Sequence, residues 1–223
     1  MTPGSSVAWR ALSSEFVGTA MLATAVVGSG IMAEQLAGGN GAVALMANAV
    51  ATGAALRVLI AVLGPLSGAH LNPVVSLAAA WWREIDASHA VARVVVQSLG
   101  AVAGVAVSHA MYALPLLQAG TIARTGPGIW LGEVLATSGL VTVIRLCPSA
   151  LAGTAVSLYI VSAYWFTSST SFANPALTMA RGLTGTFTGI RPSDTIAFIA
   201  AQAVGAVAGV LLSTLLVRDE AGV

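Results

Sequence analysis

The sequence predicts an all-α membrane protein with six transmembrane helices and two re-entrant half-helices, arranged as an inverted repeat of three plus three spans. Three observations predict it: a very apolar composition, an internal duplication, and an Asn-Pro pair at the same place in each half. Of the 223 residues, 57% are hydrophobic and only 8% are charged, whereas soluble domains carry about 25% charged residues. This composition excludes a soluble globular domain, and the net charge of +1 gives no nucleic-acid signal.

Long stretches without Asp, Glu, Lys or Arg mark the spans, because a helix needs about 20 apolar residues to cross a bilayer. Gly and Pro residues between these stretches are typical of loops. We expect one transmembrane domain over 1–223, with a first repeat at about 12–111 and a second at about 127–217. The six predicted spans cover residues 12–33, 42–63, 86–111, 127–146, 150–167 and 193–217.

The two halves of the chain share sequence features in the same order. Gln97–Ser108 matches Gln202–Ser213 at eight of twelve positions, and each segment contains a Gly-x-x-x-Gly pattern that favours close helix packing. The pattern Glu-x-x-x-Thr begins at Glu15 in the first span and at Glu133 in the fourth. Because each repeat has three spans, an odd number, the two repeats must be inserted in opposite orientations.

Gly68–Val74 and Ser171–Ala176 each place Asn-Pro inside apolar sequence. Asn is a strong helix N-cap and Pro favours the first helical position, so a helix is expected to begin at Asn72 and another at Asn174. A helix that begins inside a bilayer exposes free N–H groups and a positive dipole end. Lipid cannot satisfy them, so these starts indicate a water-filled pore.

The spacing agrees with two half-helices that meet at the bilayer midplane. From Asn72 to Arg83 is eleven residues, about 16 Å of helix and so about half of the hydrocarbon thickness. The two positive helix ends would then repel cations at the pore centre. Neutral polar solutes would accept hydrogen bonds from the amides of Asn72 and Asn174.

Arginine placement favours cytoplasmic N- and C-termini in a cell inner membrane. With that orientation Arg10, Arg83, Arg93, Arg145 and Arg218 lie inside and Arg124 and Arg191 outside. Arg57 falls within the second span, where it either snorkels to the interface or pairs with a carboxylate. Glu15 and Glu133 are intramembrane carboxylates, for which a proton relay is one interpretation. Their symmetric placement favours a structural role, accepting N–H bonds from the segments before the half-helices.

Ser67–Pro73, Asn174–Ala176 and the repeated Glu-x-x-x-Thr resemble the major intrinsic proteins, the aquaporins and aquaglyceroporins, over essentially the whole chain. The resemblance implies one pore per subunit, a homotetramer, and a selectivity filter of four residues beyond the central asparagines. By spacing from the asparagines, these four positions are Thr52, Ser162, Ser171 and Leu177.

Leu177 departs from the family pattern, in which an Arg directly follows the second Asn-Pro-Ala. All four filter residues are small or apolar, so we expect a wider and less polar constriction that admits bulkier neutral solutes. A pore that remains water-selective is the alternative. The positions around the motifs that we expect along the pore are His70, Val74, Ala176 and Arg181. The extra methyl groups of Val74 could narrow the pore centre. Arg181 either lies solvated in the mouth, the interpretation we favour, or partly replaces the missing charge.

Ala163–Thr167, Thr170–Ala176 and Thr186–Pro192 are similar to a subgroup of bacterial aquaporin-like channels that is encoded in arsenic-resistance operons and also lacks the filter Arg. This resemblance implies arsenite and methylated arsenicals as solutes, besides glycerol-like polyols and water. The competing class is an ion-coupled secondary transporter, which also uses inverted repeats. We find no pattern typical of an enzyme, and we expect no cofactor, no metal site and no nucleic-acid partner.

Overall fold

The computed structural model describes residues 3–217, and within them every regular element is a helix. Six helices are long and apolar enough to cross a membrane, which confirms the predicted all-α membrane fold. The predicted ends of the spans agree with the helix ends to within a few residues, except that α1 starts earlier and α2 ends later. The helices are α1 (Pro3–Leu36), α2 (Gly41–Ser67), α3 (Pro73–Trp81), α4 (Ala87–Met111), α5 (Pro127–Leu146), α6 (Ser149–Phe166), α7 (Pro175–Arg181) and α8 (Pro192–Leu216).

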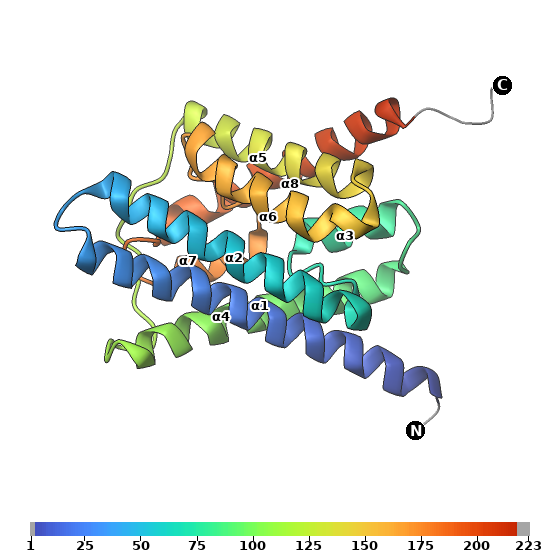
Figure 1. Ribbon diagram of the computed structural model, residues 1–223, viewed down its shortest axis with the longest axis horizontal. Helices are drawn as coiled ribbons and strands as arrows, with labels where there is room; N and C mark the ends of the chain where they lie inside the picture. The colour runs from blue at the N-terminus through green and yellow to red at the C-terminus, as the bar shows by residue number, and fades with distance from the viewer. Residues whose placement is uncertain (1–2, 218–223) are drawn as a thin grey trace.

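The six long helices form two groups of three with equivalent contacts. In the first group α1 packs against α4 and α2, and in the second α5 packs against α8 and α6. The short helices α3 and α7 lie between the groups and point toward opposite ends of the molecule (Figure 1). Helix α3 contacts α4 and α8, and α7 contacts α8 and α4. Each half-helix therefore rests on the last long helix of both groups.

Glycines bring the long helices of each group close together. A β-carbon on Gly100 or Gly104 of α4 would overlap the backbone of α1, and one on Gly205 or Gly209 of α8 would overlap that of α5. The two Gly-x-x-x-Gly patterns thus mark the tightest helix pairs, as expected for membrane helices that associate through small residues.

Asparagine begins both half-helices. Asn72 has extended backbone angles, and its Oδ1 accepts a hydrogen bond from the N–H of Val74 at 3.1 Å. The Oδ1 of Asn174 accepts from the N–H of Ala176 at the same distance. A proline occupies the first turn of each helix, where its missing N–H costs nothing. The predicted helix starts at the two Asn-Pro pairs are confirmed.

The connection between α4 and α5 folds over the end of α7. The N–H of Gln118 donates to the carbonyl of Leu183 at 3.0 Å, and the N–H of Arg191 donates to that of Ile122 at 2.8 Å. The buried ring of His109, at the end of α4, contacts the hydroxyl of Thr184 through Nε2 at 2.8 Å. These bonds fix the segment that follows α7.

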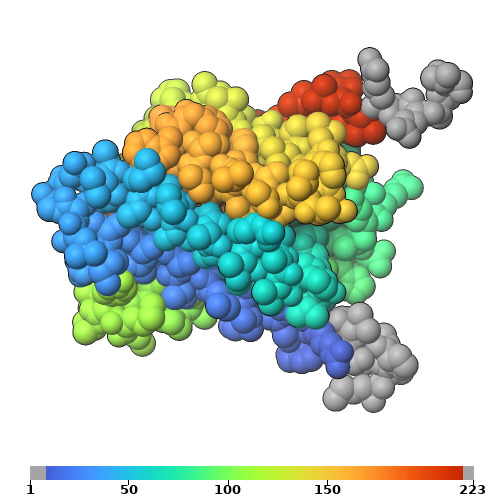
Figure 2. All heavy atoms as spheres, viewed as in Figure 1, coloured from blue at the N-terminus to red at the C-terminus, as the bar shows by residue number. Residues whose placement is uncertain are grey.

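The outer surface is rich in large apolar side chains, as a surface in contact with lipid requires. Helices α2 and α6 lie side by side on the face seen in Figure 2. A groove between them carries Arg57, whose Nε donates to the hydroxyl of Thr154 at 2.9 Å. Arg57 therefore pairs with a hydroxyl on the exposed face rather than with a carboxylate.

Candidate functional site: the central cavity

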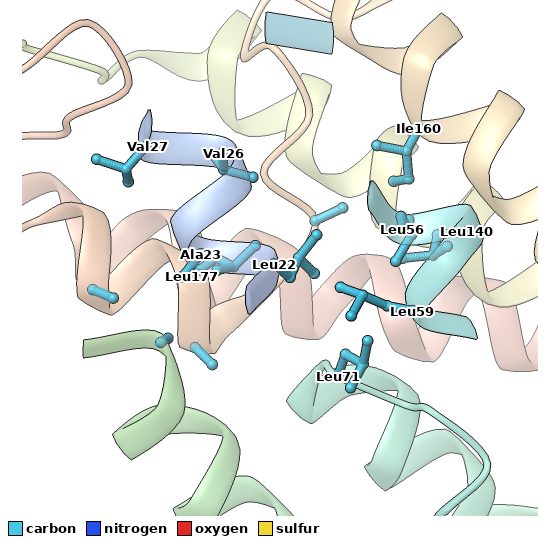
Figure 3. Close-up of a cluster of buried hydrophobic side chains, with 14 of the residues drawn as sticks. Leu22, Ala23, Val26, Val27, Leu56, Leu59, Leu71, Leu140, Ile160 and Leu177 are labelled. Atoms are coloured by element: carbon cyan, nitrogen blue, oxygen red, sulfur yellow. The ribbon is translucent and has the colours of Figure 1, made fainter. Parts of the chain in front are cut away.

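One cavity of about 320 Å³ runs through the middle of the helix bundle and is lined by both halves of the chain. It reaches Trp82 and Glu84 beyond the end of α3, and Arg181 at the end of α7. We call these ends the α3 mouth and the α7 mouth. Figure 3 shows part of its apolar wall, where Leu22 from α1, Leu56 from α2 and Ile160 from α6 are directed toward a common central region.

Asn72 and Asn174 both line this cavity and bind each other's segments. The Nδ2 of Asn72 donates to the carbonyl oxygen of Ala173 at 2.8 Å, and that of Asn174 donates to the carbonyl oxygen of Leu71 at 2.9 Å. Because Oδ1 caps the helix and one of the two N–H donors is used, each amide keeps a single free N–H. The centre of the cavity therefore offers hydrogen-bond donors and no side-chain acceptor from these two residues.

The segments before the half-helices have an unusual backbone. Ala69 and Leu71 have positive φ angles of 47° and 52°, and the equivalent residues Ser171 and Ala173 have 49° and 45°. Non-glycine residues seldom adopt this conformation, and it persists only where the surroundings hold it. The same backbone turns line the cavity, so the strained segments form part of its wall.

The carboxylate of Glu15 holds the first segment in place. Its Oε1 accepts from the N–H of His70 at 2.9 Å and from the hydroxyl of Ser67 at 2.7 Å. Its Oε2 accepts from the N–H of Leu71 at 2.7 Å and from Nε2 of Gln97 at 2.8 Å.

Glu133 repeats the arrangement in the second half. Its two oxygens accept from the N–H groups of Phe172 and Ala173 at 2.8 and 2.9 Å, and Gln202 donates to it at 2.6 Å. Both carboxylates are fully buried and neither lines the cavity. The geometry therefore favours the structural interpretation of Glu15 and Glu133 over a proton relay.

Three of the four expected filter residues lie on the cavity wall near the α7 mouth: Thr52, Ser171 and Leu177. The hydroxyl of Ser171 is buried without a hydrogen-bond partner among the described residues. A polar hydroxyl and an apolar leucine thus share this part of the wall.

The prediction for Ser162 was wrong. Ser162 is exposed on the outer face of α6, and its hydroxyl donates to the carbonyl of Tyr159 at 2.7 Å. The cavity face of α6 carries Val156, Ile160 and Tyr164, which are spaced four residues apart and so share one side of the helix. Ser162 is half a turn away from that side. Tyr164 is the residue that the spacing argument missed, and its hydroxyl donates to Thr52 at 3.3 Å.

Val74 and Ala176 are buried but do not line the cavity, so the expectation that they face the pore was also wrong. Helix α3 presents Val75 and Ala79 to the cavity, whereas α7 presents Leu177 and Arg181. Val74 precedes Val75 by one residue and Ala176 precedes Leu177 by one residue. Each is therefore rotated by about 100° around its helix, away from the side that lines the cavity. Val74 therefore does not narrow the cavity at the asparagines.

His70 and Arg181 do line the cavity, as expected. His70 Nδ1 lies 3.1 Å from the hydroxyl of Ser76 in the half nearer the α3 mouth. Arg181 is only 3% exposed, so its favoured interpretation as a solvated residue of the mouth was wrong. Within residues 3–217, no group of three or more His, Cys, Asp or Glu side chains is placed to hold a metal ion.

Known proteins resemble this chain in sequence and in fold. Aquaglyceroporin AqpS of Rhizobium meliloti (strain 1021) is 48% identical over 213 residues, which cover 94% of this chain and 91% of that protein. The lens fiber major intrinsic protein of Ovis aries is 33% identical over 127 residues, covering 56% of this chain and 46% of that protein. The X-ray structure of the aquaglyceroporin from Plasmodium falciparum matches with a TM-score of 0.66 and 22% identity, over 93% of this chain and 95% of that one, and supports the fold.

The sequence profile of one family, described as Major intrinsic protein, matches residues 4–147. Together with the AqpS relative, it agrees with the two asparagine-capped half-helices that meet in one cavity. The chain therefore belongs to the major intrinsic protein family and is an aquaglyceroporin-type channel for water and small solutes, not an enzyme.

Proposed function

We propose that the chain is a passive channel for small neutral solutes, chiefly arsenite, methylated arsenicals and glycerol-like polyols, with water as a further permeant. The observation that carries this proposal is that Leu177 lines the cavity one turn from Asn174. The family pattern has an arginine at this position, so the expected filter of this chain lacks that charged group. An arginine there would fill space and offer five N–H donors. Leucine leaves room and an apolar surface instead.

The wall of the cavity suits a solute with both polar and apolar faces. Leu56, Val156 and Ile160 form an apolar side, while the free N–H groups of Asn72 and Asn174 provide donors. A polyol turns its carbon atoms to the first surface and its oxygens to the second. Arsenous acid is a neutral compound with three hydroxyl groups at pH 7, so it resembles a polyol in hydrogen bonding and charge.

The alternative within the family is a channel that selects water. Thr52 and Tyr164 both line the cavity and are joined by a hydrogen bond at 3.3 Å, which places two hydroxyl groups together on its wall. The apolar Leu177 opposes strict water selection, because a filter for water alone depends on a narrow ring rich in donors.

The ion-coupled transporter is less favoured by the same geometry. Such a protein needs a cluster of protonatable or ion-binding groups that faces the solute pathway, and Glu15 and Glu133 are the candidates for it. Both oxygens of Glu15 and of Glu133 already accept hydrogen bonds from the backbone, and neither side chain lines the cavity.

We further propose that the chain forms one channel domain in the inner membrane, with cytoplasmic termini, and assembles as a homotetramer. In that orientation the α3 mouth faces the cytoplasm and the α7 mouth faces outward. Arg218, which contributed to the orientation argument, lies outside the described residues. The apolar α2 and α6 face and its groove around Arg57 would be buried between subunits, because an exposed guanidinium within a span is costly in lipid.

Stopped-flow permeability of proteoliposomes, measured solute by solute, tests the proposed function. We expect water, glycerol and arsenous acid to cross faster than in protein-free liposomes, and a methylated arsenical to cross as well. Liposomes that contain the same amount of Asn72→Asp protein should show lower glycerol flux than the wild type, because Asn72 lines the cavity. Facilitated water flux with no facilitated flux of any larger solute would favour the water-selective alternative and contradict the proposal.

A further inference from the structure

We propose that Arg181 is the cation-excluding and solute-orienting residue of the channel. It acts one helical turn beyond Leu177, so the channel separates selection by charge from selection by size. This inference rests on the proposed function, because it concerns how a channel for neutral solutes refuses ions. It starts from the burial of Arg181, which is 3% exposed and yet lines the cavity.

The guanidinium of Arg181 is only partly used by the protein. Its Nε donates to the carbonyl of Thr188 at 2.5 Å. Among residues 3–217, the hydrogen bonds and ion pairs include none to its two terminal nitrogens. A guanidinium has five N–H donors in a fixed plane. The four N–H donors of the terminal nitrogens therefore have no partner among residues 3–217, and we infer that they serve a solute in the cavity.

The aromatic ring of Phe172 holds this guanidinium in place. The Cζ of Arg181 lies 3.2 Å from the ring centroid, and Phe172 in turn packs edge-on against Phe198 at 5.1 Å. All three residues are buried. A guanidinium that stacks on an aromatic ring and is hydrogen-bonded through Nε has few alternative positions. Its free donors therefore keep one orientation toward the cavity.

The charge of Arg181 is not balanced within the cavity wall. The other charged residue of the lining, Glu84 at the α3 mouth, pairs with Arg145 at 2.9 Å. A second cation, Arg124, lies near the same Phe172 ring, with its Cζ 5.1 Å from the ring centroid. Arg124 is not part of the cavity lining, and its Nε donates to the carbonyl of Gly189 at 2.9 Å.

The position of Arg181 explains how the channel can be wide and still exclude cations. Arg181 follows Leu177 by four residues on the same face of α7, which places it about 6 Å nearer the α7 mouth. The unpaired charge there repels cations, and neutral solutes accept hydrogen bonds from its donors. The solutes then pass the wall formed by Leu177, Thr52 and Tyr164, which sets the size limit.

The matching residue of the first half supports this assignment. Counting seven residues from each asparagine gives Ala79 in α3 and Arg181 in α7, and both line the cavity. The repeat itself therefore does not require a charge at this position.

The test compares Arg181→Leu, Arg181→Lys and Arg124→Leu in the full chain in proteoliposomes. A potential-sensitive dye reports Na⁺ leak, a pH-sensitive dye reports proton leak, and stopped-flow light scattering reports glycerol flux. Because the charge of Arg181 acts at short range, we expect Arg181→Leu to raise cation leak by about 10-fold or more. We expect Arg181→Lys to keep cations out, and Arg124→Leu to leave cation leak unchanged because that side chain is outside the lining.

A second variant guards against a folding effect. Leu177→Arg combined with Arg181→Leu returns a guanidinium to the same helix face one turn deeper, and we expect it to restore cation exclusion while slowing glycerol. If Arg181→Leu conducts glycerol without any increase in cation leak, the inference is overturned. It is also overturned if both Arg181→Leu and the double variant lose all flux, because Arg181 would then be structural. A wild-type channel without glycerol flux would refute the proposed function, whereas the cation measurements would still report on Arg181.

Discussion

The side-chain amide of Asn174 donates a hydrogen bond to the carbonyl oxygen of Leu71 at 2.9 Å, across the junction between the two half-helices. The reciprocal bond joins Asn72 to Ala173. Each asparagine thus caps its own helix and holds the strained turn before the other one. The two halves of the chain form a single structure at the centre of the cavity, and the remaining amide donors are fixed there.

Asn174→Asp should impair neutral-solute flux and admit cations. An aspartate can still cap α7 through an oxygen, but it loses the donor to Leu71 and places a negative charge beside the cavity. We expect glycerol flux to fall about 10-fold and cation leak to rise, because one charged group at short range outweighs the half-charge of a helix end. Dye-reported ion leak and stopped-flow glycerol flux measure both effects.

Asn48→Asp is the matched control for this substitution. Asn48 is also buried, and its Nδ2 donates to the carbonyl of Val26 at 2.8 Å, but it does not line the cavity. We expect lower stability without a change in ion selectivity. Equal cation leak in both variants would show that a negative charge at the pore centre has no specific effect on ion selectivity.

Glu133→Gln should destabilise the fold, since a glutamine side chain cannot accept at both ends. One of the N–H groups of Phe172 and Ala173 would then lose its acceptor, at a cost of about 1–3 kcal/mol for a buried donor. Thermal unfolding in detergent measures this loss. If the variant keeps its thermal stability and its solute flux stops responding to a proton gradient, Glu133 is a proton relay after all.

Leu177→Arg should slow bulky solutes more than water. The added guanidinium occupies space at the wall that Thr52 and Tyr164 also form, so we expect glycerol flux to fall several-fold further than water flux. Paired stopped-flow measurements on the same proteoliposomes give the ratio. An equal loss of both fluxes would mean that position 177 does not set the size limit.

Substitutions at Ser162 and Thr52 compare a residue on the outer face of the molecule with one in the cavity wall. Ser162 is exposed on α6, whereas Thr52 lines the cavity and accepts a hydrogen bond from Tyr164. We therefore expect Ser162→Leu to leave the glycerol-to-water flux ratio unchanged and Thr52→Leu to lower it. A larger change in the flux ratio from Ser162→Leu than from Thr52→Leu would show that Ser162 does contribute to the filter.

Gly209→Leu should prevent α5 and α8 from packing. A side chain there would overlap the backbone around Ser138, and overpacking of a close contact costs about 1–3 kcal/mol or more. Yield of folded protein in detergent and its thermal stability report the effect. Gly128→Ala, at a position open on all sides, is the control and should behave as the wild type; comparable losses in the two variants would argue against the close-packing role.

Local patterns in the sequence were sufficient to predict the helices. Asn72 and Asn174 each precede a proline within apolar sequence, so capping chemistry alone gives the two starts, and charge-free stretches give the spans. The cavity lining depends on rotation about each helix, which spacing from a distant motif does not determine. Counting back from Asn174 therefore selected Ser162, although the four-residue spacing of Val156, Ile160 and Tyr164 was available in the sequence and marks the correct side.

The environment of Arg181 could not be predicted from local sequence. Its burial depends on Phe172 from the preceding segment and on Thr188 from the loop beyond α7, and that loop is fixed by bonds to the distant connection around Gln118. The contact between His109 and Thr184 likewise joins residues 75 positions apart. Such long-range contacts decide whether an arginine near a helix end is solvated or enclosed.

Glycerol flux into proteoliposomes, measured over a wide range of glycerol concentrations with and without an imposed proton gradient, tests the passive-channel assignment most directly. A continuous cavity with fixed donors, from whose lining Glu15 and Glu133 are absent, predicts flux that rises linearly with concentration and is the same in both conditions. Flux that saturates and follows the proton gradient would contradict it.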